Sequence, residues 1–385
     1  MSALGDPISE WAGGFATGGL VHLNGNSLGP PRVDLTDRLA AVVTDQWTPG
    51  QVRAWFRDGW LDLPRTVGDK LAPLLGAAEG QVVIAGDTTS TTLFNALVAA
   101  CRLRERPVLL IEAEAFPTDL YIAASVARLL GRELVVESRD GFDTYLGEHG
   151  DRVGVALAAP VDFRTGRRRD IGSTTALCHA VGALAVWDLC HAAGVLPTNL
   201  DTNDVDLAIG CGYKYLGGGP GAPAFLYVAA RWQSEVDFPL AGWHGHADPF
   251  AMTPDFVPAA GIDRGRNGTP PLLSLVALDH ALEPLVAVGI DELHRRTKEL
   301  GEAFLAGLRP DIEVVSPRDP DQRGGHLALR LPDADAVEHG LAERNVLVDA
   351  RPPDLIRVAF APLYVTPEHV RTATEAIHSV LAPPN

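Results

Sequence analysis

A single lysine stands where it could do covalent chemistry. Lys214 lies between two tyrosines in AIGCGYKYLGGGPGAPAFLYV (208–228), at the point where an apolar run gives way to glycines and prolines. A lysine amine at the end of a buried strand can form a Schiff base with a carbonyl group. The ordinary alternative is a solvated lysine in a surface loop, so the neighbouring sequence has to decide between the two.

Other chemically capable residues also follow apolar runs. Asp188 ends the run ALAVWD, and Phe116 follows the run PVLLIEA. The run VVIAG is followed by DTTSTT (87–92), which opens a helical stretch. A helix N-terminus can bind phosphate through its free N–H groups, although Asp, Ser and Thr are also ordinary capping residues. Because strands of an open α/β sheet deliver their carboxyl ends to one edge, we expect these residues to meet there.

Together these residues predict a site for pyridoxal 5′-phosphate (PLP). This cofactor needs a lysine, an acid at its ring nitrogen, a phosphate cup and a group against its ring face. The stretch GGGPG lacks G-K-[ST] and does not form G-x-G-x-x-G after an early strand, so it does not indicate a nucleotide site. The four cysteines lack metal-ligand spacing, and we expect no metal site.

The sequence pattern of the elements that must position these residues predicts an α/β fold. Between residues 82 and 228, short β-branched-rich runs alternate with helical stretches. This predicts a mostly parallel central sheet with helices on both faces, whose last two strands could be antiparallel. We expect an N-terminal arm outside both sheet cores (1–45), a large PLP-binding domain (46–275) and a small α+β C-terminal domain (276–385).

Composition narrows the class of protein. The chain has 385 residues, 46% hydrophobic residues and a formal charge of −17. An acidic surface repels nucleic acids and anionic membranes, so we expect neither as a partner. No run approaches the roughly 18 apolar residues of a membrane span, and the N-terminus lacks the pattern of a signal peptide. The cysteines read as reduced thiols, and we expect a cytoplasmic enzyme with a small-molecule substrate.

Ten motifs in order along the chain resemble those of kynureninases. They are LNGNSLGPPR, DTTSTTLF, AFPTDLYIA, VDFRTG, WDLCHAAG, CGYKYLGGGPGAPAFL, GWHGHADPF, NGTPPLLSL, SPRDPDQRGGH and IRVAFAPLY, between about residues 20 and 365. The resemblance implies a fold-type-I, class V aminotransferase-like PLP enzyme that forms a homodimer with a shared active site. Such enzymes hydrolyse the Cβ–Cγ bond of L-kynurenine or 3-hydroxykynurenine, giving anthranilate or its 3-hydroxy form and L-alanine. A role in tryptophan catabolism, NAD supply or secondary metabolism stays open.

The resemblance also implies roles for individual residues. Lys214 matches the lysine that bonds the cofactor, Tyr213 a tyrosine that reaches the phosphate and assists proton transfer, and Asp188 the partner of the ring nitrogen. The other implied cofactor contacts are the phosphate cup (Thr89, Ser90), the stacking aromatic (Phe116), polar neighbours of the ring (Asp119, His191) and two residues of the partner subunit (Trp243, Thr269).

On the substrate side, Arg357 matches the arginine that clamps the α-carboxylate, a task suited to a planar, bidentate guanidinium. The remaining implied substrate-lining residues are Ser27, Trp55, His244 and His246. The chain departs from the family pattern at Thr92, His244, Arg266 and Asn267. We expect these departures near the aromatic ring of the substrate and the dimer interface. The identity of the aryl group of the substrate therefore stays open.

Two alternatives remain. One is a related PLP enzyme acting on a modified kynurenine or another β-substituted amino acid. The other is a non-catalytic binding protein that kept the scaffold, against which the set of Lys214, Asp188 and Arg357 argues. A desulfurase would need a cysteine in the small domain, and none follows Cys211.

Overall fold

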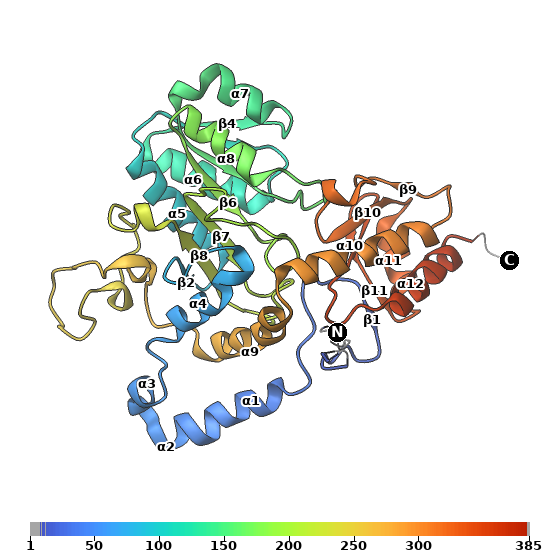
Figure 1. Cartoon of the computed structure of the whole chain (residues 1–385), viewed down its shortest axis with the longest axis horizontal. Coiled ribbons are helices and arrows are strands. Elements are labelled where there is room, and N and C mark those ends of the chain that lie inside the picture. Colours follow the sequence, from blue (N-terminus) through green and yellow to red (C-terminus); the bar gives the residue numbers. More distant parts are fainter. Residues whose placement is uncertain (1–7, 9, 12, 383–385) are drawn as a thin grey trace, which may run out of the picture.

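The computed structural model describes residues 8, 10, 11 and 13–382, and its centre is a seven-stranded sheet (Figure 1). The spatial order is β2-β8-β7-β6-β5-β3-β4. Only β8 runs antiparallel to its neighbours β2 and β7, so the mostly parallel sheet and its antiparallel last pair are confirmed. The strands are β2 (Val82–Gly86), β3 (Val108–Glu112), β4 (Glu133–Glu137), β5 (Val153–Ala158), β6 (Leu184–Asp188), β7 (Leu207–Cys211) and β8 (Ala224–Val228).

Helices cover both faces of this sheet. One face packs its alternate residues against α5 (Thr89–Leu103) and α6 (Pro117–Leu130). The opposite face packs against α4 (Leu63–Leu75), α7 (Gly141–His149), α8 (Ile171–Ala180) and α9 (Leu272–Val288). Because the strands are buried on both sides, their sequences are continuous apolar runs rather than alternating ones.

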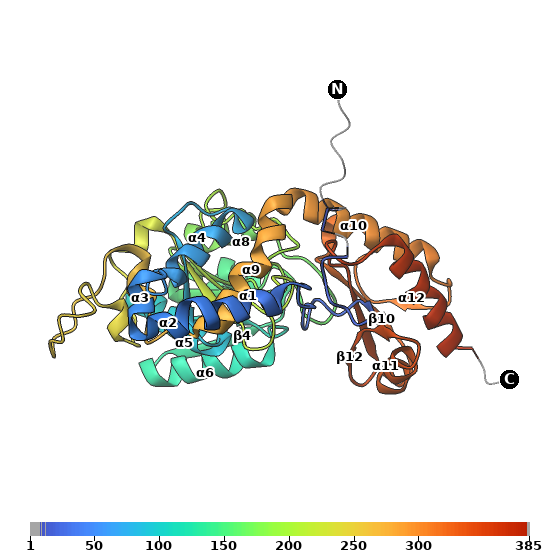
Figure 2. The ribbon, with the colours of Figure 1, turned by 90° about the horizontal axis from the view of Figure 1, so that it is seen from below.

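The C-terminal part has its own antiparallel sheet of four strands in the order β12-β13-β10-β9. The strands are β9 (Glu313–Val314), β10 (His326–Arg330), β12 (Asp349–Arg351) and β13 (Leu355–Ala359). The core of this part includes residues of α10 (Ile290–Gly307), α11 (Ala334–Ala342) and α12 (Pro367–Val380). Figures 1 and 2 show the two sheets side by side along the long axis of the molecule, with α10 leading from α9 to the smaller sheet.

Helix α9 belongs with the larger part. Leu275, Leu278 and Leu282 lie in the core formed with the seven-stranded sheet. The chain then turns at Gly289, where α9 and α10 meet at 83°. We therefore propose that the division between the two parts falls at this turn rather than at residue 275. Among the described residues no single helix is long and apolar enough to cross a membrane, although the bent pair α9–α10 passes by length and composition.

The N-terminal segment joins a sheet and a core, unlike the expected arm. Strand β1 (Val21–His22) pairs in parallel with β11 (Val346–Leu347), and Leu23 is fully buried in the core of the C-terminal part. The apolar residues on either side of His22 account for this, because they cover β11 and the small core.

The chain then passes along the larger part in short helices: α1 (Leu35–Ala41), a π-helix (Val42–Trp47), α2 (Thr48–Gly50) and α3 (Ala54–Arg57). The remaining short elements are 3₁₀ turns at Gln51–Arg53, Gly150–Arg152, Ala230–Trp232, Trp243–Gly245, Gly261–Gly265 and Pro320–Gln322.

Candidate active site

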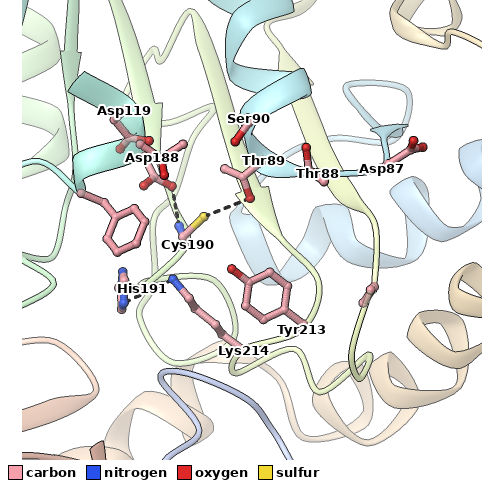
Figure 3. Close-up of a pocket in the computed structure, with 14 residues that line it drawn as sticks. Asp87, Thr88, Thr89, Ser90, Asp119, Asp188, Cys190, His191, Tyr213 and Lys214 are labelled. Carbon is pink, nitrogen blue, oxygen red and sulfur yellow. Dashed lines mark hydrogen bonds between the residues drawn. The ribbon is translucent and has the colours of Figure 1, made fainter. Parts of the chain in front are cut away.

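A cavity of about 230 Å³ lies at the carboxyl edge of the seven-stranded sheet, and we call it the Lys214 cavity. Its wall is formed by the segments that follow β2, β3, β6 and β7, as strand order requires. Figure 3 shows the side chains of these segments around one space. The wall contains eight residues that the sequence assigned to cofactor chemistry: Thr89, Ser90, Phe116, Asp119, Asp188, His191, Tyr213 and Lys214.

Lys214 follows β7 and extends to a histidine on the segment after β6. Its Nζ lies 3.3 Å from His191 Nε2 and 5.7 Å from the centre of the Phe116 ring. Burial, and then the positive charges of Lys214 and Arg357, lower the pKa of His191 well below its ordinary value. His191 is therefore a neutral imidazole that can accept a hydrogen bond from the lysine.

Two carboxyl groups lie together in the wall. Asp188 ends β6 and accepts the N–H of Cys190 at 2.8 Å, which fixes its side chain. Asp119 lies in the first turn of α6 and is 3% exposed. Burial, then the charge and hydrogen bond of Asp188, raise the pKa of Asp119 well above its ordinary value. The raised pKa favours the protonated form of Asp119, and this proton can be shared with the neighbouring carboxyl group of Asp188.

The N-terminus of α5 opens on the same cavity. Thr88 caps this 15-residue helix by accepting the N–H of Thr91, and Thr89 and Ser90 form its first turn. The first N–H groups of a helix lack intrahelical partners and carry the positive end of the helix dipole. Two hydroxyls and these N–H groups thus provide donors for an anion.

The donor set fits PLP. Figure 3 shows Asp119 and Asp188 on one side, the start of α5 beside them, and Lys214 and Tyr213 extending across the cavity. Lys214 could bond the cofactor, Asp188 could pair with its ring nitrogen, and Thr89 and Ser90 could hold its phosphate. Phe116, with its ring facing the lysine amine, could pack on the cofactor ring. These assignments rest on residue chemistry and on the shared cavity.

Arg357 lies behind this wall rather than in it. Its side chain is fully buried in β13, and its Nη2 is 2.7 Å from Asp349 Oδ2 and 3.1 Å from Ser27 Oγ. Its Nη1 donates to the backbone oxygen of Phe163, whose ring packs against Phe116 at 5.2 Å between centres. Arg357 and Ser27 therefore meet, one side chain away from the Lys214 cavity. Sequence reasoning missed Asp349 and Phe163, although a carboxylate inside the run VLVDARP was a usable signal.

The other assigned residues do not line the Lys214 cavity, although His244 and Thr269 line a cavity that shares Asp87 with it. Trp243 stacks on His244 and its Nε1 donates to Thr269 Oγ1 at 3.3 Å. Trp55 packs on Trp60 with ring centres 5.8 Å apart. His246 accepts the N–H of Asp248 through Nδ1. The assignment of Trp243 and Thr269 to the site of a partner subunit stays a prediction, and so does the substrate role of Trp55, His244 and His246.

The residues that depart from the family pattern lie in two different parts of the structure. Arg266, Asn267 and His244 line a second cavity of about 170 Å³, which also contains Thr269. Thr92 is buried inside α5, where its hydroxyl donates to the backbone oxygen of Thr88 at 3.1 Å. Three of the four departures thus lie together, whereas Thr92 replaces a side chain within the helix.

Comparison with known proteins agrees with the motifs. Residues 292–377 match the family model of the kynureninase C-terminal domain. A kynureninase from Deinococcus radiodurans is 42% identical to this chain over 98% of it and 94% of the relative. A kynureninase from Pseudomonas fluorescens is 37% identical over 94% of this chain and 89% of the relative.

Solved structures show the same fold at low sequence identity. A cysteine desulfurase from Escherichia coli superposes with a TM-score of 0.80 at 18% identity and covers 98% of both chains. A mutant of C-DES with glycine covalently linked to its PLP cofactor gives a TM-score of 0.81 at 16% identity, covering 93% of this chain and 96% of that one. With relatives 37–42% identical over nearly its whole length, the chain belongs to the kynureninase family of PLP-dependent, fold-type-I enzymes.

Proposed function

We propose that this protein hydrolyses the Cβ–Cγ bond of L-kynurenine, 3-hydroxykynurenine or both, releasing anthranilate or its 3-hydroxy form and L-alanine. Bound PLP supplies a covalent attachment for the substrate amine and a sink for electrons released from its carbon atoms. The observation that carries the proposal is the convergence of Lys214, a neutral His191 and the Asp119–Asp188 pair on one cavity.

With PLP bound, Lys214 would be the base that removes the substrate α-proton. Its Nζ is held at 3.3 Å from a neutral acceptor, His191 Nε2, which fixes its direction without adding a competing positive charge. Asp188, whose side chain is fixed by its hydrogen bond from Cys190 N, would hold the proton on the ring nitrogen of bound PLP.

Tyr213 is the acid that delivers protons to the reacting carbon and oxygen atoms. Burial, and then the neighbouring cysteines, raise the pKa of its phenol above its ordinary value. The phenol therefore keeps its proton at neutral pH and is available as a donor. Its place directly before Lys214 puts the acid and the base of the reaction on adjacent residues.

The proposal includes a homodimer. Phe56 on α3 and Phe250 are 64% and 45% exposed, and their rings contact each other at 5.2 Å between centres. Trp47, Met252 and Phe256 are exposed in the same two segments. An exposed apolar group of this kind is typical of a protein–protein interface, and we propose that a second copy of the chain covers it.

We also propose a cytoplasmic location, which the four free, buried cysteine thiols support. A small-molecule amino acid is the proposed substrate. The proposed roles of the site residues do not depend on the pathway that the reaction serves.

The test is a side-by-side assay of PLP-loaded protein with L-kynurenine and 3-hydroxykynurenine. We expect an anthranilate and L-alanine in equal amounts from at least one of them, measured by fluorescence and mass spectrometry. Release of a different aryl or amino-acid product would contradict the proposed bond cleavage. Absence of turnover with both substrates would direct attention to the Arg266–His244 cavity and a modified kynurenine.

A further inference from the structure

A buried acid joins two residues that are assigned to substrate binding. Asp349, the first residue of β12, lies with its Oδ2 2.7 Å from Arg357 Nη2. The same oxygen accepts the hydroxyl of Ser27. Segments more than 300 residues apart in sequence therefore meet on one carboxylate oxygen.

The contact is built into the small sheet. Asp349 stands directly opposite Arg357 in the antiparallel register of β12 and β13, so the two side chains share one face. Arg357 is fully buried and Asp349 is 6% exposed. Two charges buried in this way are tolerated when they pair, and removing one leaves the other uncompensated.

Asp349 also separates two positive groups. Arg351 lies two residues further along β12, on the same face, and pairs with the other carboxylate oxygen of Asp349. The single carboxylate therefore stands between a buried guanidinium, that of Arg357, and a partly exposed one. Without it, the two guanidinium groups would repel each other, and Arg357 would be held only by its hydrogen bonds to Ser27 and Phe163.

The hydrogen bonds of Arg357 leave two of its five N–H groups unused, that of Nε and one of the two on Nη1. Nη2 contacts Asp349 and Ser27, and Nη1 donates to the backbone oxygen of Phe163. Nε is buried and has no hydrogen-bond partner among the described residues. A buried donor of this kind is costly, and a carboxylate ligand would satisfy it.

We propose that Asp349 is a positioning residue for substrate recognition. It holds the guanidinium of Arg357 and the hydroxyl of Ser27 in the arrangement that receives the α-carboxylate of the amino-acid substrate. Asp349 does not line the Lys214 cavity and takes no part in the bond cleavage. This inference rests on the proposed function, because that function assigns the α-carboxylate to Arg357.

The test compares Asp349→Asn with a matched control in PLP-loaded protein. Asp354→Asn is that control, because it removes a carboxylate from a partly exposed ion pair with Arg330 of the same sheet. For Asp349→Asn we expect KM to rise about tenfold or more while kcat changes less than about threefold. The affinity for PLP and the cofactor absorbance should not change. If Asp349 had a purely structural role, the variant would lose thermal stability without a rise in KM that is larger than the change in kcat.

A double variant tests whether Asp349 acts through Arg357. Once Arg357→Lys has weakened recognition, adding Asp349→Asn should raise KM by less than about twofold more, because coupled residues are not additive. Full additivity would overturn the proposal. A KM that is unchanged or lowered in Asp349→Asn would also overturn it, and a lowered KM would show that Asp349 competes with the substrate carboxylate. If Asp349→Asn does not fold, Asp349→Glu replaces it, with a smaller rise in KM expected.

Titration with L-alanine separates this inference from the proposed function. The amino acid carries the same α-carboxylate, and its binding is read from the cofactor absorbance without turnover. Weaker L-alanine binding by Asp349→Asn in a protein that cleaves neither kynurenine would support the positioning role and reject the proposed substrate. If the wild-type protein cleaves kynurenine and Asp349→Asn binds L-alanine as tightly as wild type, the proposed function is supported and the positioning role of Asp349 is rejected.

Discussion

Lys214 Nζ lies 3.3 Å from His191 Nε2, and these residues come from segments that follow adjacent parallel strands, β7 and β6. The imidazole is buried and has a pKa well below its ordinary value, so it accepts a hydrogen bond without adding charge. The amine is thereby directed into the cavity that also holds Asp188 and the start of α5. The reactive group, its orienting partner and the acid are thus fixed by the order of strands in the sheet.

The Asp119–Asp188 pair predicts unequal effects of removing each charge. Asp119→Asn replaces a neutral acid by a neutral amide, so we expect kcat to fall by less than about tenfold. Asp188→Asn removes the carboxylate that holds the ring-nitrogen proton, so we expect a loss of about 100-fold or more. Steady-state kinetics of the two variants test this, and equal losses would contradict the assignment of the proton to Asp119.

The same pair predicts a pH effect on stability. The unfolded chain releases the Asp119 proton near its ordinary pKa of 3.8, whereas the folded protein retains it to higher pH. The contribution of Asp119 to stability is therefore present at low pH and is lost as pH rises toward the folded pKa. Asp119→Asn removes this dependence. Relative to wild type, its melting temperature without PLP should increase as pH rises above the ordinary pKa of 3.8, and a falling difference would contradict the raised pKa.

Tyr213→Phe should lower kcat by about 100-fold or more, because it removes the proposed proton donor and keeps the ring. Because the phenol pKa is raised, the wild-type rate should show no loss from phenol ionisation up to about pH 10. A pH–rate profile checks both points. A variant with wild-type kcat would remove Tyr213 from the reaction.

Arg357→Ala should raise KM by about 100-fold while the cofactor absorbance stays as in wild type. The guanidinium contacts Ser27, Asp349 and Phe163 and does not line the Lys214 cavity. Substrate titrations measure the effect. Wild-type KM in this variant would show that the α-carboxylate binds elsewhere.

Phe56→Glu should dissociate the proposed homodimer, because it places a charge in the exposed apolar group on α3. Leu129→Glu is a matched control on α6, since Leu129 is 63% exposed and Phe56 is 64% exposed. Sedimentation velocity should show a monomer with low activity for the first variant and a dimer for the second. A wild-type monomer, or an unaffected Phe56→Glu dimer, would contradict this interface.

The local features of the site were predictable from sequence because each lies at the end of an apolar run. Asp188, Lys214 and the Thr88–Ser90 stretch follow strands whose parallel order brings them to one edge. The opening of a helix within DTTSTT (87–92) was also predictable, and the structure shows that it starts at Thr89 with Thr88 as its cap.

Contacts between distant segments were not predictable in the same way. The pairing of β1 with β11 joins segments more than 300 residues apart, and no local pattern specifies it. The Asp349–Arg357 pair depends on the register of two strands that meet through a short connection. The neutral state of Asp119 depends on its burial beside Asp188, which only the folded structure reveals.

The most direct measurement is borohydride reduction of PLP-loaded protein, followed by mass mapping of the labelled peptide. The chain has three lysines, and Lys70 and Lys298 are engaged in ion pairs with Asp279 and Asp321. We predict that the reduced cofactor is found on Lys214, and that saturating L-kynurenine added before reduction removes this label. Label on Lys70 or Lys298, or label on Lys214 that L-kynurenine leaves unchanged, would contradict the assignment of the reaction to the Lys214 cavity.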